Sequence, residues 1–170
     1  MFKVLFAVVI ATTLLLCGCS DGKEMMPVKP TDLICEEEAE LAVCGADLSL
    51  EHNAVIDMGN NEFVASYYGE PLGSADPIIV SVIYPSAELS ESKIKKIYTD
   101  SYSLRDNKKK IRGLGAGAFV AFPTINIYED GHLIKITAGS GDTKEQLDLL
   151  ISLGQTAVNN LHTYLDYPNS

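Results

Sequence analysis

The residue types most often used in catalysis and metal binding are few in this 170-residue chain, and they do not form a recognisable constellation. His52, His132 and His162 fall in an expected loop, an expected hairpin and the polar side of an expected helix, without the paired spacing of metal sites. We therefore expect ordinary surface histidines and no metal. A nucleophilic thiol would need Cys35 or Cys44 beside one of these rings, and both cysteines have a simpler structural explanation. The sequence predicts neither an enzyme nor a cofactor.

A glycine-rich segment follows a run of basic residues. Lys108–Arg112 precedes Gly113, Gly115 and Gly117, and backbone amides together with lysines would attract an anion such as phosphate. Phosphate-binding glycine loops lead into a helix N-terminus, however, whereas residues 118–122 have the composition of a strand. The pattern therefore favours a bulge or a close packing contact over an anion site.

Acidic and aromatic side chains are weaker candidates for a site. The carboxylates of Glu36–Glu38 and Glu40 could hold a cation, but consecutive helical positions point in different directions, so we interpret them as a solvated face. Tyrosine combines a rigid ring with a polar tip, which suits a binding surface. We expect a ligand groove between the sheet and the middle helix, lined by Tyr67, Tyr84, Tyr98 and Tyr102.

The N-terminus has the profile of a signal peptide. Met1-Phe2-Lys3 is a short basic start, and Val4 to Leu16 carries no charge and only two threonines. A transmembrane helix needs about 20 apolar residues, whereas this run ends at Cys17-Gly18-Cys19, after which the chain is polar. We therefore expect a cleaved signal and not a membrane span.

The residues Leu16-Cys17-Gly18-Cys19 resemble the lipobox of bacterial lipoproteins, in which an aliphatic residue, a small residue and the modified cysteine stand at these positions. The resemblance implies that Cys19 receives a diacylglyceryl group, that residues 1–18 are removed and that the new N-terminus is acylated too. Two or three acyl chains make a stable anchor, since each buried methylene contributes about 0.8 kcal/mol. Ser20 implies sorting to an outer membrane where the organism has one. The alternative is a secreted protein whose leader contains both cysteines.

The mature chain would be strongly acidic. The formal net charge is −10, and removal of Lys3 with residues 1–18 leaves −10 − 1 = −11. This charge argues against nucleic acid and against docking on anionic lipids, so membrane contact would come from the N-terminal lipid. Residues 19–31 are polar, contain two prolines and predict a flexible linker. Residues 32–167 are enough for one domain with its own core.

A helix expected over residues 32–45, capped by Asp32 and ended by Gly45, contains both Cys35 and Cys44. Export to an oxidising compartment favours a disulfide between them. A continuous helix forbids it, because nine residues rise about 13.5 Å and a disulfide needs Cα atoms about 4.4–6.8 Å apart. The bridge and a pair of small buried thiols on an intact helix are exclusive alternatives.

Residues 54–105 predict an antiparallel meander followed by a helix. Three strands are expected over 54–58, 62–68 and 78–84, with turn chemistry at Gly59-Asn60-Asn61. Residues 86–105 change to helical spacing, with one face formed by Ile94, Ile97, Tyr98 and Tyr102.

The last third of the chain predicts three more strands and a long helix. Strands are expected over 118–122, 125–128 and 133–137, and Asp130-Gly131 is a strong hairpin signal between the last two. Asp142 and Glu145 resemble a capping box at the start of the helix. Gly154 lies on its apolar stripe and predicts a close approach to the sheet. The stripe consists of Leu147, Leu150, Ile151, Val158, Leu161 and Leu165.

The order of these elements predicts an α+β fold, with an antiparallel sheet of five or six strands and helices packed on it. The arrangement is similar to that of small α/β sandwich lipoproteins with a PsbP-like fold, in which a glycine-rich segment precedes a late hairpin and a final helix. This resemblance covers topology only, so it implies a fold and no functional residues.

Three classes of function fit these observations. We favour a non-catalytic binding or accessory lipoprotein of the cell envelope, anchored on the extracytoplasmic side of a membrane, which holds a protein or a small ligand. The alternative is an inhibitor whose acidic surface captures a basic enzyme such as a lysozyme, and absence of binding at low salt would exclude it. A hydrolase is the least favoured class, since the sequence shows no pair of nucleophile and base.

Overall fold

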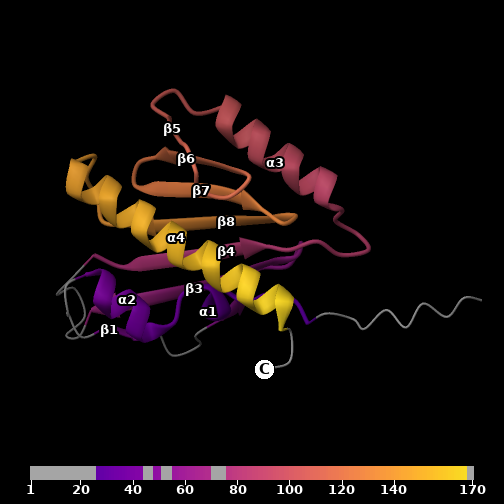
Figure 1. The fold of residues 1–170 in the computed structure, drawn as a ribbon, viewed down its shortest axis with the longest axis horizontal. Helices are drawn as coiled ribbons and strands as arrows, with labels where there is room; N and C mark the ends of the chain where they lie inside the picture. The colour runs from indigo at the N-terminus through magenta and orange to yellow at the C-terminus, as the bar shows by residue number, and fades with distance from the viewer. Residues whose placement is uncertain (1–25, 44–47, 51–54, 70–75, 168–170) are drawn as a thin grey trace, which may run out of the picture.

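The computed structural model describes residues 26–43, 48–50, 55–69 and 76–167, which form one antiparallel sheet with helices packed on it (Figure 1). The helices are α1 (Pro30–Leu33), α2 (Glu36–Ala42), α3 (Glu91–Ser103) and α4 (Lys144–Asp166). The strands are β1 (Leu48–Leu50), β2 (Ile56–Asp57), β3 (Glu62–Gly69), β4 (Ile78–Ile83), β5 (Lys109–Ile111), β6 (Gly117–Ala121), β7 (Thr124–Glu129) and β8 (His132–Ala138).

The described strands pair antiparallel in the order β1-β3-β4-β8-β7-β6-β5, with β2 paired to β3 as the eighth strand. The predicted α+β class with an antiparallel sheet and a long C-terminal helix is confirmed. The expected five or six strands did not include β1 and β5. Each of these has only three residues, which is too short for a periodic pattern to show in the sequence.

Two turns are formed by residues that tolerate a positive φ. Asp130 (φ 43°) and Gly131 (φ 77°) make the two-residue loop of the β7–β8 hairpin, in which Glu129 pairs with His132. Two positive φ values are the signature of a type I′ turn, whose twist matches that of the flanking strands. The sequence therefore predicted this hairpin from its turn chemistry.

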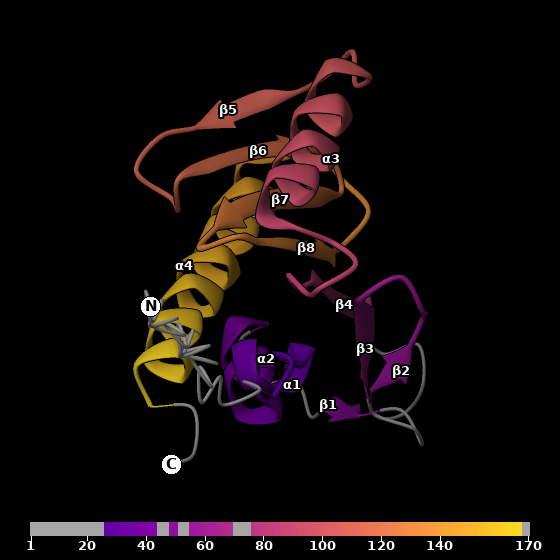
Figure 2. The ribbon, with the colours of Figure 1, turned by 90° about the vertical axis from the view of Figure 1, so that its right-hand side faces the viewer.

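Successive residues of a strand face opposite sides of the sheet, and different helices cover the two sides (Figure 2). Ile134 and Ile136 of β8 belong to the main core, together with Leu150 of α4. Leu133, the neighbour of Ile134, packs on the other side against Ile94 of α3. The two helices α3 and α4 thus enclose the centre of the sheet.

The longest helix, α4, covers the apolar side. The side-chain oxygen of Thr143 accepts a hydrogen bond from Gln146 N at 3.2 Å, so the helix is capped one residue later than the expected pair at Asp142 and Glu145. The predicted apolar stripe packs on the core. Gly154 provides the predicted close approach, since a Cβ there would lie 2.8 Å from Ile127 Cδ1. Among the described helices, none is both long enough and apolar enough to cross a membrane.

Two short helices replace the single helix expected over residues 32–45. The backbone is extended at Ile34 and Cys35, which frees carbonyl groups that a continuous helix would use. The Tyr67 hydroxyl donates to Ile34 O, and Asn160 Nδ2 of α4 donates to Leu33 O at 3.0 Å. These donors from distant parts of the chain satisfy the carbonyl groups at the break. Ile34 can therefore be buried without a continuous helix.

The first described contacts with the core lie within residues 19–31, which the sequence predicted to be a flexible linker. Val28 is 2% exposed, and Met26 O accepts a hydrogen bond from the Tyr164 hydroxyl at 3.0 Å. Asp32 is not the helix cap. Its carboxylate lies in the first turn of α1 and accepts a hydrogen bond from Lys29 N at 2.8 Å. The domain therefore includes residues 26–31, because Val28 adds to the core.

We expect Gly154→Val to destabilise the domain by about 2 kcal/mol, because overpacking a filled core costs about 1–3 kcal/mol. Urea unfolding followed by circular dichroism measures the loss. Ser152→Val, on the exposed side of the same helix, controls for the low helix propensity of valine. Equal unfolding midpoints for the two variants would show that Gly154 has no packing role.

Candidate functional site

The side of the sheet that faces α3 is only partly covered, and its uncovered part is polar. Ser81 of β4, Lys135 of β8 and Asn126 of β7 lie in one cross-strand row there. A cavity of about 260 Å³ lies over this row, and we call it the open-face pocket. Its lining consists of Glu62, Val64, Ile79, Ser81, Arg105, Ala121, Thr124, Asn126, Lys135 and Thr137.

An ion pair organises one wall of the open-face pocket. Lys135 Nζ lies 2.9 Å from Glu62 Oε1, and Ser81 Oγ donates to the same oxygen at 2.5 Å. Burial opposes ionisation of Glu62, but the hydrogen bonds from Ser81 and Lys135 and the charge of the lysine outweigh it and hold the pKa of Glu62 below its usual range. Glu62 is therefore ionised at neutral pH and balances the charge of Lys135.

Asn126 is the pocket side chain that folding explains least. It is only 9% exposed, yet its amide group has no hydrogen-bond partner in the described part of the chain. The nearby hydroxyls of Thr124 and Thr137, by contrast, bond to each other at 2.7 Å. Because no fully buried side-chain nitrogen or oxygen of the described residues lacks a partner, the amide atoms of Asn126 are open to the pocket. Asn126 therefore directs unused donor and acceptor capacity into the pocket.

A second cavity, which we call the side pocket, adjoins the first and has a volume of about 330 Å³. Arg105 and Ala121 line both pockets, so the two meet at these residues. Among the residues that the structure describes, Arg105, Asp106 and Asp142 have no oppositely charged group within 4.0 Å. The side pocket is lined by Arg105, Asp106, Asn107, Ala121, Phe122 and Asp142.

The structure does not bring the four predicted tyrosines into one groove. Tyr67 is fully buried on the α4 side, where its hydroxyl donates to Ile34 O and burial raises its pKa above the usual range. Tyr84 stacks on Phe63, with ring centroids 5.3 Å apart. Tyrosine content predicts aromatic contacts, but it cannot predict which face of the sheet each ring joins.

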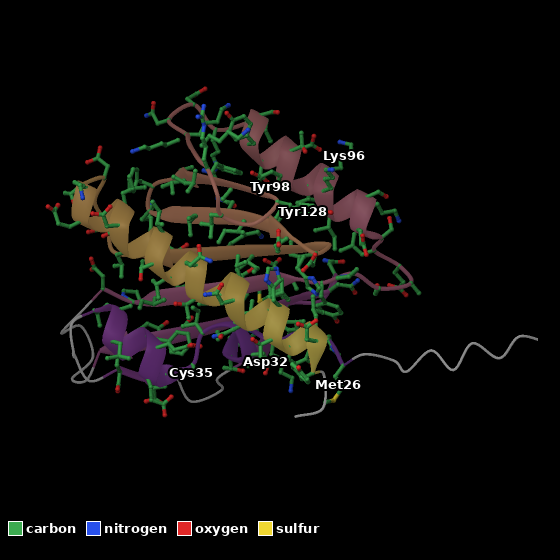
Figure 3. All side chains as sticks on the ribbon, in the orientation of Figure 1. Met26, Asp32, Cys35, Lys96, Tyr98 and Tyr128 are labelled. Atoms are coloured by element: carbon green, nitrogen blue, oxygen red, sulfur yellow. The ribbon has the colours of Figure 1, made fainter. Side chains whose placement is uncertain are left out.

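Tyr98 and Tyr102 are the two predicted tyrosines that lie between α3 and the sheet. Their ring centroids lie 5.4 and 5.2 Å from that of Phe119. Tyr98 also lies near Tyr128, at 5.9 Å, and Figure 3 shows these two rings between α3 and β7. Phe119 pairs with Asn126 across β6 and β7. The aromatic cluster therefore positions α3 beside the open-face pocket, whose own lining is polar.

Cys35 and Glu38 have structural roles at the start of α2. The Cys35 thiol is half-buried at the start of α2, and burial raises its pKa, which lowers its thiolate content. Glu38 accepts hydrogen bonds from Cys35 N at 2.9 Å and from Asn160 Nδ2, so it is not simply solvated. Cys44, the partner of Cys35 in the disulfide alternative, and Cys19 lie outside the described residues.

His132 is buried, contrary to the expected surface position. It is 4% exposed, and its Nδ1 lies 2.7 Å from Asp130 O. Burial lowers the pKa of His132 despite this hydrogen bond, so the ring is neutral at neutral pH. The tip of its hairpin packs on α3, since a Cβ on Gly131 would meet Glu91 Cγ. His52 lies outside the described residues.

His162 meets two carboxylates, a cluster that the sequence did not predict. Its Nε2 lies 2.8 Å from Glu129 Oε1 and 3.3 Å from Asp130 Oδ2, and their ligand atoms lie within 4.8 Å of one another. These donor types suit a divalent cation. Glu129 is already bonded to His162 and, through Oε2, to Ala116 N. These contacts are therefore explained as polar interactions that hold the β7–β8 hairpin against α4.

The glycine segment packs closely on its neighbours, as the sequence favoured. A Cβ on Gly115 (φ 56°) would lie 3.1 Å from Tyr128 O, and a Cβ on Gly117 would lie 3.0 Å from the Tyr98 hydroxyl. The amide of Ala116 between them donates to the Glu129 carboxylate. The Glu129 carboxylate thus already accepts the hydrogen bond of an amide that a bound phosphate would need.

The negative charge of the chain is unevenly distributed. Residues 93–112 contain eight Lys or Arg and two Asp or Glu, a net charge of 8 − 2 = +6 in a chain of −10. They span α3 and β5 at one end of the molecule, and Figure 3 shows Lys96 there, far from Asp32 and Cys35. The net negative charge of the chain therefore lies outside residues 93–112.

Comparison of the chain with protein-family models, with curated proteins and with solved structures finds no match. Its function must therefore be argued from its own side chains. The residues of the two pockets are the most informative of these.

Glu62→Gln should reduce the acid sensitivity of the domain. Because the folded-state pKa of Glu62 is lowered, its carboxylate contributes stability above the unfolded-state pKa of about 4.3, and this contribution is lost as the pH falls through the lower folded-state value. We expect the wild type to have the larger free energy of unfolding at neutral pH, and the gap to close as the pH falls below the folded-state pKa of Glu62. Urea titrations of both proteins, with exposed Glu88→Gln as control, measure this. A gap independent of pH would contradict the role of the ion pair.

Proposed function

We propose that this chain is a lipoprotein of the cell envelope that binds a small polar molecule in the open-face pocket without converting it. One observation carries the proposal: Asn126 is 9% exposed and has no partner among the described residues, yet it lines a cavity. The amide is open to the cavity, since no fully buried side-chain nitrogen or oxygen of the described residues lacks a partner. A ligand in the cavity could therefore bond to Asn126.

The size and lining of the cavity favour a small ligand. Its volume is about 260 Å³, near the lower end of the volumes of ligand pockets. Apolar walls at Val64 and Ile79 stand beside polar groups that converge from β4, β7 and β8. Such convergent polar groups in a concave site fix the orientation of a ligand.

Binding is favoured over catalysis by the chemistry of the nearest nucleophile. The Ser81 hydroxyl donates to Glu62, whose lowered pKa makes it a poor general base at neutral pH. The charge of Lys135 is held by the same carboxylate. No histidine is among the described residues that line either pocket. A hydrolase therefore stays the least favoured class.

The proposed anchor would hold the domain with its pockets away from the membrane. Residue 26 enters beside the C-terminal end of α4, where Tyr164 bonds to Met26 O (Figure 1). Asp142 of the side pocket lies at the other end of this helix, about 30 Å away at 1.5 Å per residue. A lipid on Cys19 would thus leave the pockets accessible from the extracytoplasmic space.

Replacement of the lipobox cysteine tests the anchor. In a bacterial host we expect the wild type in the membrane fraction, with the mass of a chain that begins at Cys19 plus acyl groups. Cys19→Ala should lose the acyl mass and the membrane association, because no thiol is left to modify. Cys17→Ala is the matched control and should keep both. An unacylated wild-type chain, cut elsewhere, would overturn the anchor and indicate free secretion.

Asn126→Leu should separate stability from binding. We expect the variant without ligand to keep roughly the stability of the wild type in urea, since the amide has no partner in the described part of the chain and leucine has a similar size. Thermal shifts with succinate, N-acetylglucosamine, glycerol 3-phosphate and alanyl-alanine test the pocket. At least one should raise the melting temperature of the wild type, as a ligand of the folded state must, and should fail with Asn126→Leu.

The matched control is Asn159→Leu on the exposed side of α4, which should keep the shift. A marked loss of stability in Asn126→Leu would show that Asn126 serves the fold, and would remove the observation on which the proposal depends. No shift with any of the four probes would also count against it.

A further inference from the structure

We infer that the open-face pocket and the side pocket together bind a zwitterion of the size of an amino acid or short peptide, with its carboxylate at Arg105 and its ammonium group at Asp106 and Asp142. This inference rests on the proposed function and names the class of ligand. It depends on the charges at the place where the two pockets meet.

Arg105 is the cation available to a ligand carboxylate. It lines both pockets and has no ion-pair partner among the described residues. The other cation, Lys135, is balanced by Glu62 at 2.9 Å. A guanidinium group presents two parallel N–H donors that match a carboxylate. A carboxylate in the joined pockets is therefore best stabilised at Arg105.

The two carboxylates of the side pocket select against a simple anion. Asp106 and Asp142 line the cavity next to Arg105 and are likewise unpaired in the described part of the chain. They would repel a second anionic group and attract an ammonium group, whereas Arg105 would repel a simple cation. Arg105 lies in the basic stretch 93–112, so selection against a simple anion would come from Asp106 and Asp142.

The rest of the lining suits an amide between the two charged ends. The side chain of Asn126 offers a donor and an acceptor, the combination that pairs with a peptide group. Ala121 and Phe122 provide apolar surface at the junction and in the side pocket, enough for a small aliphatic side chain. A dipeptide of small residues therefore satisfies more of these groups than a free amino acid does.

The test is isothermal titration calorimetry of the folded domain with alanyl-alanine and two blocked analogues. N-acetyl-alanyl-alanine lacks the ammonium group, and alanyl-alaninamide lacks the carboxylate. We expect each blocked analogue to bind at least about tenfold more weakly, the factor expected for loss of one charge-assisted hydrogen bond. Free alanine should bind more weakly than the dipeptide, because it has no peptide group for Asn126.

Two substitutions assign the charged ends separately. Arg105→Gln should weaken the binding of alanyl-alanine but make little difference to the binding of alanyl-alaninamide, which has no carboxylate to contact Arg105. Asp142→Asn should weaken the binding of alanyl-alanine but make little difference to the binding of the N-acetylated dipeptide, which has no ammonium group. Arg112→Gln and Asp166→Asn, which change the net charge equally but line neither pocket, are the matched controls and should bind as the wild type does.

The outcomes distinguish this inference from the proposed function. Equal affinity for the N-acetylated and free dipeptides would overturn the inference of a zwitterionic ligand and would indicate a pocket for small anions. No binding of alanyl-alanine, together with a thermal shift by succinate, N-acetylglucosamine or glycerol 3-phosphate that depends on Asn126, would overturn the zwitterion alone. No binding of any of these compounds would overturn both.

Discussion

The candidate site depends on one constraint, the unequal covering of the two sides of a single sheet. A β-strand sends alternate side chains to opposite sides, so every strand that contributes to the core under α4 also presents residues to the other side. There α3, with 13 residues, covers the sheet at Leu133 and Tyr128, whereas α4 has 23 residues on the apolar side. The strands therefore carry polar residues where α3 does not reach, and a pocket forms between the helix end and the sheet.

The polar row contains one side chain that the fold leaves available to a ligand. Glu62 accepts a hydrogen bond from Ser81 and pairs with Lys135. The hydroxyls of Thr124 and Thr137 bond to each other. Most polar groups of the row therefore have partners within the fold. Asn126 stands among these closed contacts with its amide unused. Its amide atoms are open to the pocket, since no fully buried side-chain nitrogen or oxygen of the described residues lacks a partner. The amide is therefore available to a ligand.

Several local predictions failed where β3, α3 and α4 supplied partners from far along the chain. The break between α1 and α2 is stable because Asn160 and Tyr67 bond to the carbonyls that it frees. His132 is buried because the hairpin tip meets α3. In each case the local residues were compatible with the predicted state, and a tertiary hydrogen bond or packing contact decided otherwise.

The sequence by itself determined the α+β class, the β7–β8 hairpin, and the long final helix with a close approach at Gly154. These features follow from turn chemistry and periodicity, which act between residues a few positions apart. The tertiary structure alone decided the pockets, whose key side chains are Glu62, Ser81, Arg105, Asn126, Lys135 and Asp142. In the sequence each of them is an ordinary polar residue of a strand, a turn or a helix start. Only the register of β3, β4, β8 and β7 and the place where α3 ends bring them together.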